Sequence, residues 1–222
     1  MSINSYYFIK LLSDALPSDA VVVVGTGTSF TCTYQAAKMK LGQRWINASG
    51  LAPMGYALPA SIGAAFATGK KVVCIVGDGD LQFNLQELAV IAHHKLPIII
   101  FVLNNGGYLT IMHMQSNHFD RYVGSEKGSG VSFPCLFMLA EAYGFHYTNL
   151  FAQGDDLGGM IEDLVSSRGP NLCEVMMPPD QPLIPRVSSK KMPDGSITSS
   201  PIEDMFPFLG REEFNENMET SG

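Results

Sequence analysis

Residues 71–80 read KVVCIVGDGD, and residues 97–107 read PIIIFVLNNGG. Each stretch is a short apolar run, rich in β-branched residues, that ends in small polar residues. An uninterrupted apolar run is typical of a strand in a parallel sheet that is covered on both faces. Polar residues at the end of such a strand lie where open α/β sheets bind their ligands. These two stretches therefore indicate both a fold class and the place of a site.

The same alternation of apolar strands and helices extends along most of the chain. The runs expected to be strands are residues 20–24, 71–76, 97–103, 145–150 and 172–176. The stretches expected to be helices are residues 3–16, 58–67, 85–94, 134–143 and 157–166, with a further helix after Tyr108. Strands that alternate with helices predict an α/β fold with a doubly wound, mostly parallel sheet and helices on both faces.

Composition excludes several classes of protein. The 222 residues are 46% hydrophobic and 16% charged, which excludes a chain that is mostly disordered. The net charge is −7 and no dense Lys/Arg block occurs, so we expect no nucleic-acid or membrane partner. The four cysteines lie far apart without a C-x-x-C pair, which argues against a zinc site or a disulfide framework. The apolar runs are too short to span a bilayer, the N-terminus does not resemble a signal peptide, and we expect a cytoplasmic protein.

The last part of the chain differs in character from the rest. Residues 188–222 hold three basic and seven acidic residues, a net charge of −4, together with prolines, phenylalanines and methionines. The apolar residues indicate an arm that packs on the main domain or on a partner, and a mobile tail is the alternative. We therefore expect a domain over residues 1–187 and an acidic C-terminal arm over residues 188–222.

The residue types at the two strand ends predict a magnesium site. Asp78 offers a carboxylate and Asn105 an amide oxygen, which are ligands that Mg²⁺ prefers. Twenty-four residues separate Gly79 from Asn104, enough for one helix and one strand, so both motifs are expected at neighbouring strand ends. The glycines around them allow the backbone to approach a ligand, and a helix that starts there directs N–H groups at an anion. Together these features predict a site for magnesium and a diphosphate.

Two other motifs fit the sequence less well. An EF-hand that starts at Asp78 would need a glycine where Phe83 stands and a glutamate where Ala89 stands. The stretch from Gly25 to Phe30 is similar to the dinucleotide fingerprint G-x-G-x-x-G, but Phe30 replaces its third glycine. No acidic residue follows about twenty positions later at a strand end, as that fingerprint requires.

GDG followed after this interval by NN resembles the signature of enzymes that use thiamine diphosphate (ThDP). Residues 49–60, SGLAPMGYALPA, are similar to the loop GLGTMGxGLPAA of the acetolactate synthase-like group within these enzymes. The stretch from about Ser5 to Val187 resembles the C-terminal, diphosphate-binding domain of that group. The resemblance implies the ThDP-binding fold, with ThDP and Mg²⁺ as cofactors.

The resemblance also implies roles for individual residues. Asp78, Asn105 and the backbone carbonyl of Gly107 would bind Mg²⁺. Met54 would hold the two cofactor rings in a V shape, and the carbonyl of Ala52 would accept a hydrogen bond from the 4′-amino group, so these two residues would take part in cofactor activation. The remaining residues that would contact the cofactor are Thr28, Ser29, Gly77, Gly79, Asp80, Asn105 and Tyr108.

Proton removal from the cofactor in this family is assisted by a glutamate that a separate pyrimidine-binding domain supplies. No motif places a glutamate of this chain in that role; the candidates considered are Glu87, Glu126, Glu141 and Glu174. Some decarboxylases carry a catalytic glutamate in the helix after Tyr108, and the matching position here is Ile111. The chain is therefore expected to hold half of an active site and to need a pyrimidine-binding domain, from a separate subunit or from a longer chain, in a homo- or hetero-oligomer.

The resemblance favours a ThDP- and Mg²⁺-dependent 2-oxo acid decarboxylase or carboligase component of the acetolactate synthase-like type, acting on a small 2-oxo acid. A β subunit of a split sulfopyruvate- or phosphonopyruvate-type decarboxylase is an alternative. A catalytically silent ThDP-binding or regulatory module is an alternative of another class, against which the intact Asp78 and Asn105 argue.

Overall fold

The computed structural model describes residues 2–151, 156–191 and 194–219. The chain divides into two units, Met1–Gln181 and Pro182–Gly222. The division lies six residues before the predicted domain boundary, which was placed after Val187. Within the described ranges, no helix has the length and the apolar character needed to cross a membrane.

The first unit is built around a six-stranded sheet in which every neighbouring pair of strands is parallel. Its strands are β1 (Val21–Val24), β2 (Arg44–Ile46), β3 (Val72–Gly77), β4 (Ile98–Asn104), β5 (His146–Leu150) and β6 (Asn171–Met176), in the order β2-β1-β3-β4-β6-β5. The five predicted strands are confirmed, and β2 is an additional short strand at the edge of the sheet.

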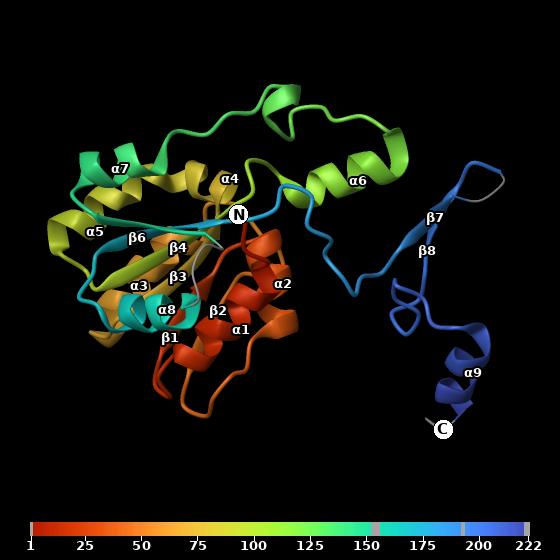
Figure 1. Ribbon diagram of the computed structural model, residues 1–222, viewed down its shortest axis with the longest axis horizontal. Coiled ribbons are helices and arrows are strands. Elements are labelled where there is room, and N and C mark those ends of the chain that lie inside the picture. The colour runs from red at the N-terminus through yellow and green to blue at the C-terminus, as the bar shows by residue number, and fades with distance from the viewer. Residues whose placement is uncertain (1, 152–155, 192–193, 220–222) are drawn as a thin grey trace. The chain divides into compact units, whose positions relative to one another are not determined.

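Helices cover both faces of this sheet (Figure 1). The α-helices are α1 (Ser5–Ala15), α2 (Thr28–Ala36), α3 (Ala57–Thr68), α4 (Asp78–Leu81), α5 (Leu88–His94), α6 (Leu109–Phe119), α7 (Leu136–Tyr143) and α8 (Leu157–Ser166), with 3₁₀ turns η1 (Gln82–Glu87) and η2 (Lys127–Ser129). Helices α1, α2 and α8 pack together, and α3, α5 and α7 form the opposite layer. The prediction of a doubly wound α/β fold is confirmed.

The centre of the sheet is fully buried, which explains the uninterrupted apolar runs in the sequence. Strand β4 has no exposed side chain, and its Phe101 ring packs on Phe8 of α1 at a centroid distance of 5.4 Å. The other face of the sheet packs on side chains of α3, α5 and α7, such as Leu58 and Ile91. Burial on both faces requires apolar side chains at successive positions of a strand.

The strand order places a crevice between β1 and β3. From β1 the chain crosses to β2 on one side, then returns past β1 to β3 on the other side, so the winding direction changes between these two strands. Ligands of open α/β sheets bind beyond the carboxyl ends of the strands at such a change of direction. Strands β3 and β4 are also neighbours, with Gly77 opposite Leu103. The GDG and NN motifs therefore leave the sheet side by side, as predicted.

Two segments differ from the expected helices. Helix α2 was not predicted, because the side chains that it buries are Thr28, Ser29, Cys32 and Thr33, which form no apolar stripe. The predicted helix over residues 85–94 is divided into η1 and α5, and Asn84 within η1 has non-helical backbone angles (φ −138°, ψ 37°).

The second unit has a small structure of its own. Strands β7 (Ser189–Lys191) and β8 (Ile197–Ser199) pair antiparallel, and α9 (Arg211–Glu219) follows. Arg186 and Phe206 form an isolated antiparallel bridge through two backbone hydrogen bonds of 3.0 and 2.8 Å. Both terminal nitrogens of Arg211 donate to the carboxylate of Asp204 at 2.8 Å. The predicted acidic arm thus contains a hairpin and a helix.

Candidate functional site

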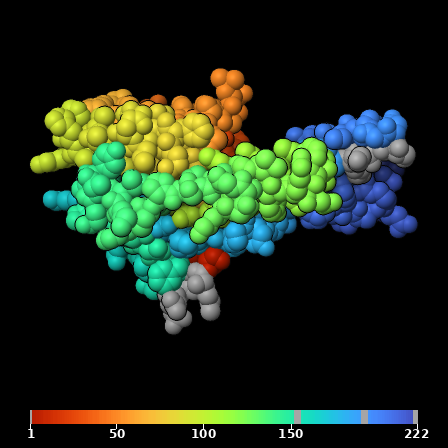
Figure 2. Space-filling model, turned by 90° about the horizontal axis from the view of Figure 1, so that it is seen from above, coloured from red at the N-terminus to blue at the C-terminus, as the bar shows by residue number. Residues whose placement is uncertain are grey.

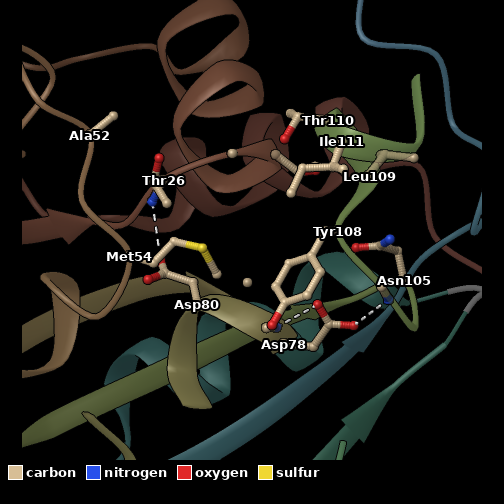
Figure 3. Close-up of a pocket in the computed structure, with 15 residues that line it drawn as sticks. Thr26, Ala52, Met54, Asp78, Asp80, Asn105, Tyr108, Leu109, Thr110 and Ile111 are labelled. Carbon is tan, nitrogen blue, oxygen red and sulfur yellow. Dashed lines mark hydrogen bonds between the residues drawn. The ribbon is translucent and has the colours of Figure 1, made fainter. Parts of the chain in front are cut away.

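A pocket of about 240 Å³ lies beyond the carboxyl ends of β1, β3 and β4 (Figure 3). Its lining comes from the loop after β1, the loop before α3, the GDG motif, the NN motif and the start of α6. The residues that line it are Thr26, Gly27, Thr28, Ala52, Met54, Gly77, Asp78, Gly79, Asp80, Asn105, Gly107, Tyr108, Leu109, Thr110 and Ile111. All the predicted site residues except Ser29 are therefore brought together in one pocket.

Asp78 lies at the bottom of this pocket with 3% of its surface exposed. Its Oδ2 atom accepts hydrogen bonds from the N–H groups of Gly106 at 2.7 Å and Gly107 at 3.2 Å, and its Oδ1 atom accepts from Gly79 at 2.8 Å. Burial raises the pKa of this carboxyl from 3.8 to about 6, although the backbone donors act in the opposite direction. Asp78 therefore connects the GDG and NN loops and holds a carboxylate that lacks a cationic neighbour among the lining residues.

Asn105 and Gly107 lie beside Asp78, on the loop after β4. Asn105 is 8% exposed, and its side-chain nitrogen is buried without a hydrogen-bond partner among the described residues. Buried polar atoms of this kind are rare, and a bound group at the site is one explanation for them. Gly107 is fixed from the other side, since it forms an antiparallel bridge with Glu126, and the next N–H, that of Tyr108, donates to the carbonyl of Ser125 at 2.8 Å.

Gly79 is required by a close approach of Tyr108. A Cβ atom at position 79 would lie 2.3 Å from Cε1 of the Tyr108 ring and 3.1 Å from the ring of Phe133. The two rings pack edge to face with centroids 5.6 Å apart. The segment from α6 to α7, which carries Phe133, runs in Figure 2 as a green band beside the yellow residues of η1 and α5. Tyr108 is thus held against the GDG motif by the segment that follows it.

Met54 and Ala52 line the side of the pocket opposite the NN loop. The Met54 side chain extends from its loop toward Asp80, whereas Ala52 lies farther from Asp78 on the same loop (Figure 3). Ala52 has a φ of +46°, in the left-handed region that a residue with a Cβ atom adopts at a cost of about 1–2 kcal/mol. The loop to which residues 49–60 are similar carries glycine at this position, so Ala52 retains a backbone shape that glycine adopts without strain.

The first βα loop differs in part from the prediction. Thr28 begins α2 and lines the pocket, where the first N–H groups of a helix favour an anion. Ser29 is fully buried, lies outside the lining, and donates its hydroxyl to the carbonyl of Thr26 at 2.7 Å. The Ser29 side chain therefore does not line the pocket, because its hydroxyl bonds within the turn of the loop, and its contact with the cofactor stays a prediction.

Comparison with known proteins agrees with this geometry. The family described as "Thiamine pyrophosphate enzyme, C-terminal TPP binding domain" matches residues 25–175. The chain belongs to the thiamine pyrophosphate enzymes. Thiamine pyrophosphate and ThDP are the same compound, so the match confirms the resemblance seen in the sequence. It covers the strands from the end of β1 to β6 and all the pocket-lining residues.

Individual relatives point to one group of ThDP enzymes. The chain is 30% identical over 194 residues to acetolactate synthase 1, chloroplastic, of Nicotiana tabacum, which covers 85% of this chain and 29% of that protein. It is 35% identical over 159 residues to the acetolactate synthase large subunit of Cyanidium caldarium, which covers 71% of this chain and 26% of that protein. The chain therefore spans less than a third of the length of these relatives.

The pocket of this ThDP-enzyme domain fits a metal ion and a diphosphate. Asp78, Asn105 and Gly107 all line the pocket and carry carboxylate, amide and carbonyl oxygens, and hard oxygen donors suit Mg²⁺. None of the described lining residues is lysine or arginine, whereas two of them, Asp78 and Asp80, are acidic. A diphosphate could not approach two carboxylates without a cation between them. Neither at this pocket nor at any other place among the described residues could a group of three or more His, Cys, Asp or Glu side chains hold a metal ion.

One functional region of the domain was not predicted from the sequence. Glu174 of β6 is 9% exposed and accepts hydrogen bonds from the Asn104 amide and from the Tyr147 hydroxyl. The Asn104 side-chain oxygen in turn accepts from the N–H of Gly106 at 3.0 Å, and that same N–H donates to Asp78. Glu174 therefore supports the NN loop from behind. The hydrogen bond between Glu174 and Asn104, on the neighbouring strands β6 and β4, could not be read from residues 70 positions apart.

Proposed function

We propose that this chain supplies the diphosphate- and Mg²⁺-binding half of the active site of an acetolactate synthase-like 2-oxo acid decarboxylase or carboligase. The observation that carries the proposal is that Asp78, Asn105 and Gly107 line one pocket beyond the carboxyl ends of the neighbouring strands β3 and β4. The names of the similar proteins support the acetolactate synthase-like type. As part of this proposal, the substrate of the complete enzyme is a small 2-oxo acid, and the product of its decarboxylation passes to an acceptor or a proton.

The residues of the pocket have separate tasks in this proposal. Asp78, the Asn105 amide oxygen and the Gly107 carbonyl bind the cation, which neutralises the diphosphate. The N-terminus of α2, beginning at Thr28, binds the diphosphate oxygens. When bound, ThDP supplies a nucleophilic carbon and an electron sink for breaking or forming the bond next to a carbonyl group. Met54 would support the cofactor from the side, and the Ala52 carbonyl would accept a hydrogen bond from the pyrimidine amino group.

A pyrimidine-binding domain with a glutamate is part of the proposal. The acidic residues among the lining residues are Asp78 and Asp80, and backbone N–H groups occupy the carboxylates of both. Ile111 lies in the lining where some decarboxylases carry glutamate. Two apolar side chains close in sequence to lining residues are exposed: Leu51, next to Ala52, at 92%, and Met114, on α6 with Ile111, at 47%. An exposed apolar surface of this kind is typical of a contact with another domain or subunit.

Calorimetric titration of the chain with ThDP in the presence of MgCl₂ tests the binding half of the proposal. We expect binding that chelation of the metal abolishes, and we expect Asp78→Ala to weaken it by at least 100-fold because the charged ligand is lost. Asp163→Ala, which changes an exposed aspartate of α8, is the matched control and should bind as the parent chain does. Equal binding by Asp78→Ala and the parent chain would contradict the assignment of the metal site.

Carbon dioxide release from 2-oxo acids tests the catalytic half. We expect no turnover by the chain alone, and turnover once a pyrimidine-binding domain is added or joined to it. The coding sequence next to that of this chain is the first place to find such a domain. Steady carbon dioxide release by the chain alone would show that turnover does not require a glutamate from a pyrimidine-binding domain.

A further inference from the structure

The carboxylate of Asp80 connects two loops of the pocket that are far apart in the sequence. Its Oδ2 atom accepts a hydrogen bond from the N–H of Thr26 at 3.0 Å, and its Oδ1 atom accepts from the N–H of Gly55 at 2.5 Å (Figure 3 shows the first of these). Asp80 is 4% exposed, so both bonds are shielded from water. The carboxylate thus bridges the loop after β1 and the loop that carries Met54.

Gly55 is held at both of its backbone polar groups by the segment after the GDG motif. Asp80 accepts from its N–H, and the Asn84 side-chain nitrogen donates to its carbonyl at 2.7 Å. The non-helical backbone of Asn84, which divides η1, brings its side chain to Gly55. An interruption of this kind in a helical segment often marks a functional position. The non-helical backbone at Asn84 therefore allows its side chain to hydrogen-bond to Gly55 in the Met54 loop.

The first loop is shaped to receive the same carboxylate. A Cβ atom at Gly25 would lie 2.1 Å from Oδ2 of Asp80, so any other residue there would displace the carboxylate. The glycine at the start of the first loop thus leaves room for Asp80 and for the bond to Thr26.

From these contacts we infer that Asp80 is a positioning residue, which acts with Asn84 to fix Met54 relative to the diphosphate-binding loops. The N–H of Gly55 belongs to the planar peptide unit that joins Met54 to Gly55, so a bond to it fixes the orientation of the Met54 backbone. The other oxygen of the same carboxylate holds Thr26, next to the N-terminus of α2. This inference rests on the proposed function, because holding the two loops in place affects cofactor binding only if these loops bind ThDP.

A positioning role and simple charge repulsion predict opposite effects of Asp80 on cofactor binding. A carboxylate in a pocket without a lysine or arginine in its described lining repels a diphosphate, so removal of its charge should strengthen binding. Asp80→Asn removes the charge at nearly constant shape. Its amide can accept from one of the two N–H groups but presents its own NH₂ group to the other. If Asp80 acts by positioning, the variant releases one loop and binds ThDP more weakly.

Two measurements on Asp80→Asn and Asn84→Ala test the inference. The first uses the methyl signals of ¹³C-methyl-methionine in the cofactor-free chain, where Met54→Leu identifies the Met54 signal. We expect both variants to shift or broaden the Met54 signal and to leave that of the exposed Met138 on α7 unchanged.

The second measurement is calorimetric titration with ThDP and MgCl₂, in which we expect Asp80→Asn to weaken binding about tenfold, equivalent to about 1.4 kcal/mol. We expect Asn84→Ala to weaken binding less, because it removes one of the bonds to Gly55 and leaves both hydrogen bonds of Asp80 in place.

Asp156→Asn is the matched control, since Asp156 accepts a backbone N–H, that of Gly159 at 2.8 Å, at the start of α8. It should change neither the Met54 signal nor the affinity. Equal or tighter ThDP binding by Asp80→Asn with an unchanged Met54 signal would overturn the inference. If Asp80→Asn does not fold, an unchanged Met54 signal and unchanged affinity in Asn84→Ala would overturn it. Failure of the parent chain to bind ThDP, with the Met54 signal still responding to both variants, would overturn the proposed function and leave the role of Asp80 in place.

Discussion

Asp78 should make the stability of the cofactor-free chain depend on pH. Burial raises the pKa of its carboxyl from 3.8 to about 6, so the folded chain retains this proton at a pH where the unfolded chain has lost it. A group with a raised folded pKa stabilises the fold fully below its unfolded pKa, and this contribution is lost as the pH rises through the folded pKa. At about 1.4 kcal/mol for each tenfold change, the raised pKa of Asp78 corresponds to about 3 kcal/mol.

The substitution Asp78→Asn isolates this contribution, because the amide does not titrate. We expect the free energy of unfolding of the parent chain, minus that of the variant, to fall by about 3 kcal/mol between about pH 3 and pH 8. Asp80, whose pKa burial also raises, is present in both proteins and largely cancels in the difference. Magnesium should reduce the fall in the parent chain alone, since the cation binds the charged carboxylate.

Urea unfolding followed by fluorescence provides the assay, and Trp45 of β2 is the only tryptophan in the sequence. Asp163→Asn is the matched control for the substitution, because it changes an exposed carboxyl of α8 outside the pocket. A difference between the parent chain and Asp78→Asn that stays constant or rises with pH would refute the reasoning. It would mean that the carboxylate is solvated, and a solvated carboxylate would not be the buried metal ligand described above.

Three further substitutions follow from contacts of the pocket and its support. Gly79→Ala should abolish the ThDP binding measured by calorimetry, since its Cβ would lie 2.3 Å from the Tyr108 ring. Its control is Gly158→Ala in α8, where no atom lies within 4 Å of the added carbon. This control should raise the free energy of unfolding by about 0.5–1 kcal/mol. Ala52→Gly should relieve the left-handed backbone at φ +46° and raise the free energy of unfolding, measured with urea, by at most about 1 kcal/mol. A lower free energy of unfolding would contradict the strain. Glu174→Gln should lower the free energy of unfolding by about 1–3 kcal/mol, because one of its two donors then faces an NH₂ group, and an unchanged urea midpoint would show that this buried contact contributes nothing.

Most of the sheet could be predicted because its signal is local. Each of the five predicted strands is a run of apolar residues, and burial on both faces of a parallel sheet requires such a run. β2 was missed because it has three residues at the sheet edge, where Arg44 is exposed. α2 was missed because it packs small polar side chains against its neighbours, and this packing leaves no apolar period in the sequence.

The pocket was predicted in its residue types but only partly in its contacts. Asp78 and Asn105 lie at the ends of neighbouring strands, as the interval between GDG and NN indicates. Ser29 was assigned to the pocket because of its place in the first loop, whereas the loop turns so that its hydroxyl bonds to Thr26. The carboxylate of Asp80 could not be assigned to its partners, because they lie 54 and 25 residues away in the chain.

The sequence by itself determined the fold class of this protein, the strand ends that carry its chemistry and the residue types suited to magnesium and a diphosphate. It could do so because a buried strand is a continuous run of apolar residues, and its end is marked by the polar residues that follow directly. The tertiary structure alone decided which donor each buried carboxylate receives, and how Glu174 and Asp80 support the two sides of the pocket. A hydrogen bond depends on atoms that meet in space, and those partners come from loops that only the folded sheet brings together.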